Sequence, residues 1–338
     1  MKKGHRRVLS MSVTPQLSSR ISYQPLTQSS NQSPSGKAKQ VGRYETYRGL
    51  LPPVMPSSKV GELYVSLRTG RSRGGPKYES QDVYFDQVNG PARLLGVADG
   101  HGPQGQRVAD FIAKKLPLML FQRNIKKDAE SFTHALTLSL IDCNILLKDS
   151  EIEAENSGTT CLSLLISGNL IACCNVGDSR AILGRCMRGA WSVHQLSWDH
   201  KPENPQELER IVGAGGSVSP SKGRSGSYRV YASGGKSPGL TLSRVVGHRK
   251  AEAVGVICEP EVQSATLSAA DKFIIVATDG LWHVMTSIEV VKLASAFYQM
   301  NPSSVAEALA SEAERRWGLQ GSYMDDITVL FLPILLST

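Results

Sequence analysis

The chain has 338 residues, of which 41% are apolar, and a formal net charge of +8. This length suits one large domain or two ordinary ones with a buried core. No apolar run reaches the roughly 18 residues of a membrane span. The sequence shows no secretory signal, and Lys2 does not fit the N-myristoylation pattern.

The positive charge belongs to the start of the chain. Residues 1–50 carry nine Lys or Arg and one acid, whereas the other 288 residues carry 29 basic and 29 acidic residues. Residues 1–40 are rich in Ser, Gln, Pro and Lys, so we predict a disordered basic tail. Such a tail could be merely solvated, or it could contact acidic partners, lipid head groups or RNA.

The six cysteines form no C-x-x-C pair, and those at 161, 173 and 174 lie in apolar surroundings. They are typical of small buried hydrophobic residues and do not favour a zinc site. This pattern fits a reducing compartment, so we expect an intracellular protein, cytoplasmic and/or nuclear.

Short β-type runs alternate unevenly with helical patterns after residue 60. Strands are predicted over residues 62–67, 92–98, 160–166, 169–176, 181–186, 272–277 and 327–332. Helices are predicted over 107–121 (cut by Pro117), 129–147, from 204 to 215, over 287–300, and over 303–317 with Ser303 as its N-cap.

This element order is not the regular βαβα alternation of a doubly wound fold. It predicts an α+β layered architecture in which antiparallel sheets are covered by helix pairs. Residues 41–338 would form this domain. Residues 217–239, rich in Gly, Ser and basic residues, would form a functional loop or small subdomain within it.

Carboxylates recur where apolar runs begin or end. They are Asp82, Asp99, Asp178, Asp279, Asp325 and Asp326. Each is a common turn residue by itself, but acids that converge repel one another unless a cation neutralises them. Oxygen ligands select hard cations such as Mg²⁺ or Mn²⁺. Two such ions could lower the pKa of a water and hold the phosphoryl oxygens during an in-line attack.

Two neighbours of Asp99 suit the same chemistry. Gly100 lets the backbone approach an ion closely, so its carbonyl could be a ligand. His101 could protonate a leaving alkoxide, because imidazole titrates near neutral pH.

These residues lie in motifs that resemble the metal-dependent serine/threonine phosphatases of type 2C. The resemblance runs from about residue 61 to 332 and is carried, in the family's order, by SQDVYF, VADGHG, SGTTCLSLLI, NVGDSRAIL, LSWDHKPENPQELERIVGAGG, GLTLSRVVG, EPEV, ATDGLW and DDITVL. It implies two antiparallel sheets packed face to face and flanked by helix pairs, a four-layer α-β-β-α fold. The implied activity is hydrolysis of phosphoserine and phosphothreonine in proteins. The family is mostly monomeric, so the resemblance also implies a monomer.

The resemblance also implies residue roles. Two Mn²⁺ or Mg²⁺ ions would be held by Asp82, Asp99, Gly100, Asp279 and Asp325. Asp178 matches an acid at a third, weaker metal site, His101 matches the proposed general acid, and Lys77 falls at a phosphate-binding position. Residues 217–239 fall at the family's flap, a segment associated with substrate choice.

Two histidines depart from the family pattern. His283 follows DGLW where an acid associated with the third metal is usual, and His248 ends SRVVGH where the family has Asp. One hypothesis is an active phosphatase whose altered third site prefers Mn²⁺ over Mg²⁺. The alternative for His283 is that it caps a helix or packs on Trp282. Two other functions stay open, namely a catalytically weak or dead scaffold and a protein that binds RNA or anionic lipid through the tail.

Overall fold

The computed structural model describes residues 60–71, 79–221 and 227–336. The predicted tail and Lys77 therefore lie outside the described residues. The strands are β1 Tyr64–Arg68, β2 Asp82–Asn89, β3 Ala92–His101, β4 Gly158–Thr159, β5 Cys161–Ser167, β6 Leu170–Val176, β7 Arg180–Met187, β8 Ala190–Gln195, β9 Gly216–Pro220, β10 Tyr228–Ala232, β11 Pro238–Leu240, β12 Val246–Gly247, β13 Glu261–Thr266, β14 Asp271–Ala277 and β15 Ile327–Pro333. The helices are α1 Gly105–Phe121, α2 Ala129–Lys148, α3 Pro205–Gly213, α4 Arg249–Glu252, α5 Asp279–Trp282, α6 Ser287–Met300, the 3₁₀ turn η1 Pro302–Ser304 and α7 Val305–Gln320.

Two antiparallel sheets form the centre of the domain. One has the order β1-β15-β14-β7-β8, and the other has the order β12-β4-β3-β5-β6-β13 with β2 paired to β3. Their facing sides share one buried cluster, to which β3 contributes Leu95 and Val97 and β14 contributes Ile274 and Val276. Alternate residues of a strand point to opposite faces, so the intervening residues cover the outer sides.

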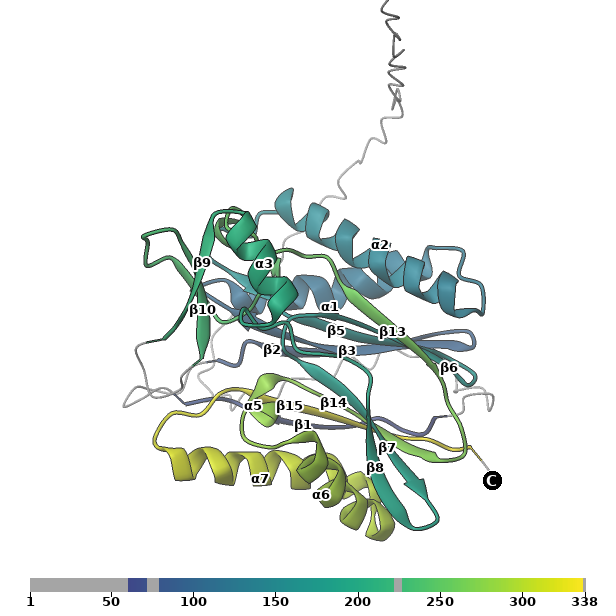
Figure 1. Cartoon of the computed structure of the whole chain (residues 1–338). Helices are drawn as coiled ribbons and strands as arrows, with labels where there is room; N and C mark the ends of the chain where they lie inside the picture. Colours follow the sequence, from purple (N-terminus) through teal and green to yellow (C-terminus); the bar gives the residue numbers. More distant parts are fainter. Residues whose placement is uncertain (1–59, 72–78, 222–226, 337–338) are drawn as a thin grey trace, which may run out of the picture. The chain divides into compact units, whose positions relative to one another are not determined.

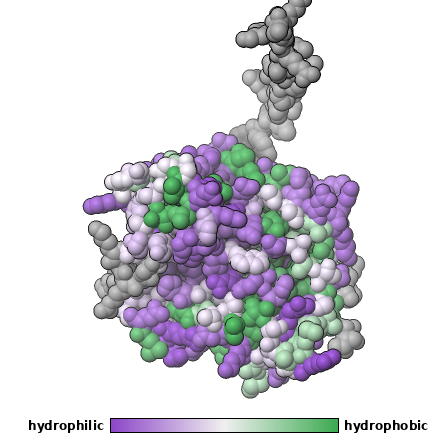
Figure 2. Space-filling model, in the orientation of Figure 1, coloured by the Kyte–Doolittle hydropathy of each residue, from purple (hydrophilic) through white to green (hydrophobic). Residues whose placement is uncertain are grey.

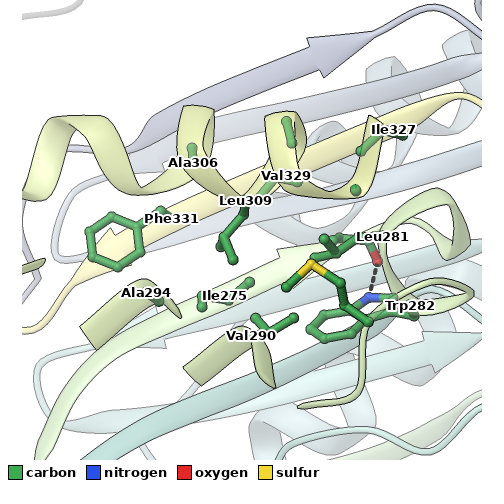
Figure 3. Packing of buried hydrophobic residues seen from close by; sticks show 14 of the residues in the cluster. Ile275, Leu281, Trp282, Val290, Ala294, Ala306, Leu309, Ile327, Val329 and Phe331 are labelled. Carbon is green, nitrogen blue, oxygen red and sulfur yellow. Dashed lines mark hydrogen bonds between the residues drawn. The ribbon is translucent and has the colours of Figure 1, made fainter. Parts of the chain in front are cut away.

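A helix pair covers each outer side, which gives four layers (Figure 1). Helices α1 and α2 bury Ile112 and Leu136 against Leu94 of β3. Helices α6 and α7 pack on β14 and β15, and Leu281 and Trp282 of α5 point into the same layer (Figure 3). The predicted α+β class with antiparallel sheets and flanking helix pairs is confirmed.

Two predicted details of the helices are wrong. Helix α1 continues through Pro117. Proline removes one backbone hydrogen bond, but the fully buried side chains of Leu116 and Leu120 on either side hold the helix against β3. Helix α7 begins at Val305, and Ser303 lies in the preceding 3₁₀ turn, where its N–H donates to the side chain of Asn301.

The predicted insertion at 217–239 contains strands of a small sheet with the order β11-β10-β9. Val230 and Leu240 of this sheet pack with Ile211 of α3 and Val254 in a separate buried cluster. The sequence did not predict these strands, because the run is dominated by Ser, Gly and basic residues.

Among the described residues, no helix is both long and apolar enough to cross a membrane. In the orientation of Figure 1, hydrophilic residues lie across the middle of the visible face, and hydrophobic residues form scattered patches around them (Figure 2).

Candidate metal centre

Three of the predicted acids meet at one end of the two sheets. Asp99, Asp178 and Asp279 follow the apolar parts of β3, β6 and β14, and one carboxylate oxygen of each lies within 4.8 Å of the others. Asp178 is buried and the other two are partly exposed. The cluster therefore joins both sheets at an edge that a ligand can reach.

Asp82 lies beside this cluster because β2 pairs with β3 so that Asp82 is opposite Asp99. Its Oδ2 accepts hydrogen bonds from the hydroxyls of Thr278 and Thr328, both at 2.7 Å. Its Oδ1 is enclosed and has no hydrogen-bond partner among the described residues. An enclosed carboxylate oxygen without a donor is an unfavourable arrangement unless a cation binds it.

The pKa values of these acids show the same deficit of positive charge. Burial and the charge of Asp326 raise the pKa of Asp82 to about 7, although the two threonine hydrogen bonds oppose them. Burial and neighbouring carboxylates also raise the pKa values of Asp99 and Asp279. Because the side-chain atoms that could bind a metal here are all oxygens, the arrangement fits a hard divalent cation such as Mg²⁺ or Mn²⁺.

The neighbours Asp325 and Asp326 have different partners. Asp325 accepts a hydrogen bond from Tyr323 Oη at 3.0 Å, and burial raises its pKa. Asp326 accepts the backbone N–H of Gly70 at 2.6 Å and that of Gln81 at 2.9 Å. Asp326 thus joins two chain segments to the start of β15, a role that the DD sequence alone did not reveal.

Gly100 is required by a close approach of two backbone segments. A Cβ atom at this position would lie 2.4 Å from the carbonyl oxygen of Gly105 and 2.9 Å from that of Gln81. The Gly100 N–H donates to Gln81 O at 3.1 Å. This contact keeps the turn between β3 and α1 beside Asp82, and a ligand role for the Gly100 carbonyl remains a prediction.

Lys201 is a residue that sequence reasoning missed. Its ammonium group forms an ion pair with the carboxylate of buried Asp178. Burial lowers the pKa of Lys201, but the charges of Asp178 and Asp279 outweigh it, and the net effect is a raised pKa. The basic residue in the DHKP run was the only signal, and it did not identify the partner.

His101 contacts His248, one of the two histidines that depart from the family pattern. Its Nε2 lies 3.1 Å from Nδ1 of His248. Burial and the charge of His248 lower the pKa of His101 to about 3, although the charge of Asp178 opposes them. The His101 ring is therefore neutral at neutral pH before any ligand binds.

His283 packs elsewhere. Its ring is stacked on Trp317, with centroids 5.1 Å apart and an interplanar angle of 9°. The residue occupies the C-cap position of α5. This geometry favours the packing alternative, although the partner is Trp317 instead of Trp282.

Comparisons with known proteins agree with this architecture. The family model "Protein phosphatase 2C" matches residues 76–317. The chain is 34% identical over 284 residues to "Probable protein phosphatase 2C 34" of Arabidopsis thaliana, covering 77% of this chain and 78% of the relative. It is 31% identical over 304 residues to "Probable protein phosphatase 2C 35" of the same plant, covering 83% and 86%.

Solved structures share the fold at low identity. A serine-threonine phosphatase 2C from Toxoplasma gondii aligns with a TM-score of 0.69 at 20% identity, over 84% of this chain and 97% of that one. A C. elegans sex-determining protein aligns with a TM-score of 0.66 at 21% identity, over 81% and 64%. Together with the sequence matches, these findings confirm the predicted family and fold: the chain belongs to the protein phosphatase 2C family of serine/threonine phosphatases.

Proposed function

We propose that this chain hydrolyses phosphoserine and phosphothreonine in proteins with the help of two divalent metal ions, Mn²⁺ or Mg²⁺. The observation that carries the proposal is the set of converging carboxylates, above all the enclosed Oδ1 of Asp82, which has no hydrogen-bond donor among the described residues. Asp82, Asp99, Asp279, Asp325 and the carbonyl of Gly100 would hold the ions. When bound, such ions supply a water of lowered pKa and neutralise phosphoryl oxygens.

The chain's own groups have defined tasks in this proposal. The threonine hydroxyls at Thr278 and Thr328 fix the orientation of Asp82. Asp178 would serve a third, weaker ion, in competition with Lys201. Lys77 stays a predicted phosphate-binding residue.

His101 would donate a proton to the leaving serine or threonine oxygen. Its ring is neutral in the free site, so it must gain a proton when substrate binds. A phosphate dianion beside the ring favours the charged form, because opposite charges at short range raise the pKa of a histidine.

The test is hydrolysis of a phosphothreonine peptide in the presence of Mn²⁺. The wild-type chain should release phosphate, and Asp279→Asn should reduce kcat by at least about a hundredfold, since it removes a charged ligand of the ions that would stabilise the transition state. The exposed Glu209→Ala on α3 is the matched control.

The competing hypothesis is a catalytically weak or dead scaffold, which the two histidine departures favour. A wild-type chain that binds Mn²⁺ but releases no phosphate would support the scaffold and contradict the enzyme. Activity that survives Asp279→Asn unchanged would contradict the assigned metal ligands.

The finer context is also proposed. We infer intracellular phosphoprotein substrates, a monomeric enzyme, and a role in substrate choice for the small sheet β9–β11. Contact of the basic tail with nucleic acid or anionic lipid is not needed for this function.

A further inference from the structure

The contact between His101 and His248 is built by the backbone. His101 ends β3 and His248 follows β12, and both strands pair with the two-residue strand β4. Gly158 of β4 lies opposite His101 on one side and opposite Gly247 on the other. A Cβ atom at Gly158 would lie 3.1 Å from Cε1 of His101, so the missing side chain leaves room for the ring.

His248 is held firmly in this place. Its N–H donates to Ser157 O at 2.7 Å, and its carbonyl accepts from Ala251 N at 2.8 Å. Its φ of 53° lies in the left-handed region, which is uncommon for a residue with a side chain. The residue is only 6% exposed. A strained and buried histidine that touches a proposed catalytic residue calls for a functional explanation.

The contact restricts what His101 can do. A hydrogen bond between the two ring nitrogens engages Nε2 of His101 and leaves Nδ1 as the ring nitrogen without a partner among the described residues. A hydrogen-bond partner on one ring nitrogen of a histidine decides which of the two nitrogens carries the proton. For His101 that partner is a second imidazole, the ring of His248.

We propose that His248 is a positioning residue: it accepts the Nε2–H of His101 and so directs Nδ1 of His101 to the leaving-group oxygen. This inference rests on the proposed phosphatase function. In the acid step, the P–O bond to the leaving group breaks and its electron pair stays on that oxygen. The oxygen takes the proton from Nδ1, and His101 returns to the neutral form, still donating Nε2–H to His248.

The leaving group distinguishes this role from a merely structural one. A threonine alkoxide needs a proton as it leaves, whereas the dinitrophenolate released from 2,4-dinitrophenyl phosphate does not. Loss of an oriented acid should therefore slow hydrolysis of a phosphothreonine peptide and spare hydrolysis of the aryl phosphate. Loss of the fold or of the metals should slow both.

The variants follow from the backbone conformation. His248→Gly removes the ring without strain at φ 53°. His248→Asn keeps an acceptor oxygen near the position of Nδ1, and Asn tolerates left-handed φ values. His134→Asn, at an exposed position of α2, is the matched control. Each protein is assayed with Mn²⁺ on both substrates, and its thermal midpoint is measured.

We expect His248→Gly to lower kcat for the phosphothreonine peptide about 10- to 100-fold, a share of what acid catalysis supplies, with less than about a threefold change for the aryl phosphate. His248→Asn should restore most of the peptide activity. In ¹⁵N-labelled protein, the hydrogen-bonded Nε2–H signal of His101 should be present in the wild type and lost in His248→Gly.

An equal fall on both substrates, or unchanged peptide activity in His248→Gly, would overturn the positioning role while leaving the phosphatase function intact. A wild-type chain that hydrolyses neither substrate would instead refute the proposed function, and the positioning role with it.

Discussion

The carboxylate of Glu207 and the carboxylates of the aspartates at the strand ends have opposite electrostatic surroundings. Glu207 of α3 is 4% exposed and forms ion pairs with Arg244 at 2.7 Å and Arg210 at 2.9 Å. Although burial raises its pKa, the two guanidinium groups hold the pKa of Glu207 well below its usual range. In the part of the chain that the structure describes, the side-chain partners of Asp82 are only threonine hydroxyls, and its pKa is raised to about 7.

This difference in partners distinguishes a carboxylate with a structural role from carboxylates of a functional site. Glu207 carries its counter-ions within the fold and therefore holds α3 against the segments that precede and follow β12. Asp178 is paired with the ammonium group of Lys201, but Asp82, Asp99 and Asp279 have no ion-pair partner among the described residues, so their charge is left for a cation from outside. A perturbed pKa thus points to the site only when no protein partner accounts for it.

The largest expected effect on stability concerns Glu207, whose charge is paired with two arginines. Glu207→Ala should lower the free energy of unfolding by about 3 kcal/mol, because it leaves two partly buried guanidinium groups without their anion. Urea unfolding followed by circular dichroism measures this loss. Glu209→Ala on the exposed face of the same helix should stay within about 0.5 kcal/mol of wild type. Equal effects of the two substitutions would contradict the structural role of Glu207.

Metal binding at the aspartates of the strand ends is expected to stabilise the folded protein. Mn²⁺ at a hundredfold excess over its Kd should raise the free energy of unfolding by about 2.7 kcal/mol, since the ion binds only the folded site. The gain should increase from pH 5 to pH 7, because the ion must displace protons from acids of raised pKa such as Asp82. Removal of the metal with a chelator should reverse it. A gain that is independent of pH would contradict the pKa assignment.

Asp82→Asn should make the metal-free protein more stable at pH 8 by about 1–3 kcal/mol, because an enclosed charge without a full set of donors is removed. The sign follows from the raised pKa. The folded protein binds the Asp82 proton more tightly than the unfolded chain, so this carboxylate costs stability as the pH rises from about 4 to about 7.

The gain from Asp82→Asn should therefore vanish near pH 4. Unfolding in chelator at both pH values measures it, and the substituted protein should also lose part of its stabilisation by Mn²⁺. Destabilisation at pH 8 would show that Asp82 has a structural partner.

The smallest effect concerns His283. Loss of its ring in His283→Ala should cost about 0.5–1.5 kcal/mol, the contribution of one aromatic stack, here with Trp317. The ratio of activities with Mn²⁺ and Mg²⁺ should not change. A changed ratio would restore the hypothesis that His283 is a metal ligand.

The sequence predicted much of this arrangement because local patterns carry it. Apolar runs that end on Asp-Gly located β3 and β14, and the acids at strand ends predicted a common edge of the sheets. The sequence also placed Asp82 at the head of a strand, where β2 begins.

The parts that sequence reasoning missed depend on contacts between distant segments. Lys201 meets Asp178 only because the loop after β8 returns to the end of β6. His101 and His248 are 147 positions apart and meet across β4. Asp325 and Asp326 are adjacent and chemically identical, so only the course of the backbone decides which of them anchors Gly70 and Gln81.

The turn at Gly280 has a consequence for how the site fails. A methyl group there would lie 1.9 Å from the carbonyl oxygen of Asp326, and the indole N–H of Trp317 donates to the Gly280 carbonyl at 2.7 Å. Helix α7 thus supports two acid-bearing segments at once, although it carries none of the aspartates of the candidate metal centre. On gradual heating, loosening of α7 would displace Asp279 and the 325–326 pair together, so affinity for the ions would decline before the two sheets separate.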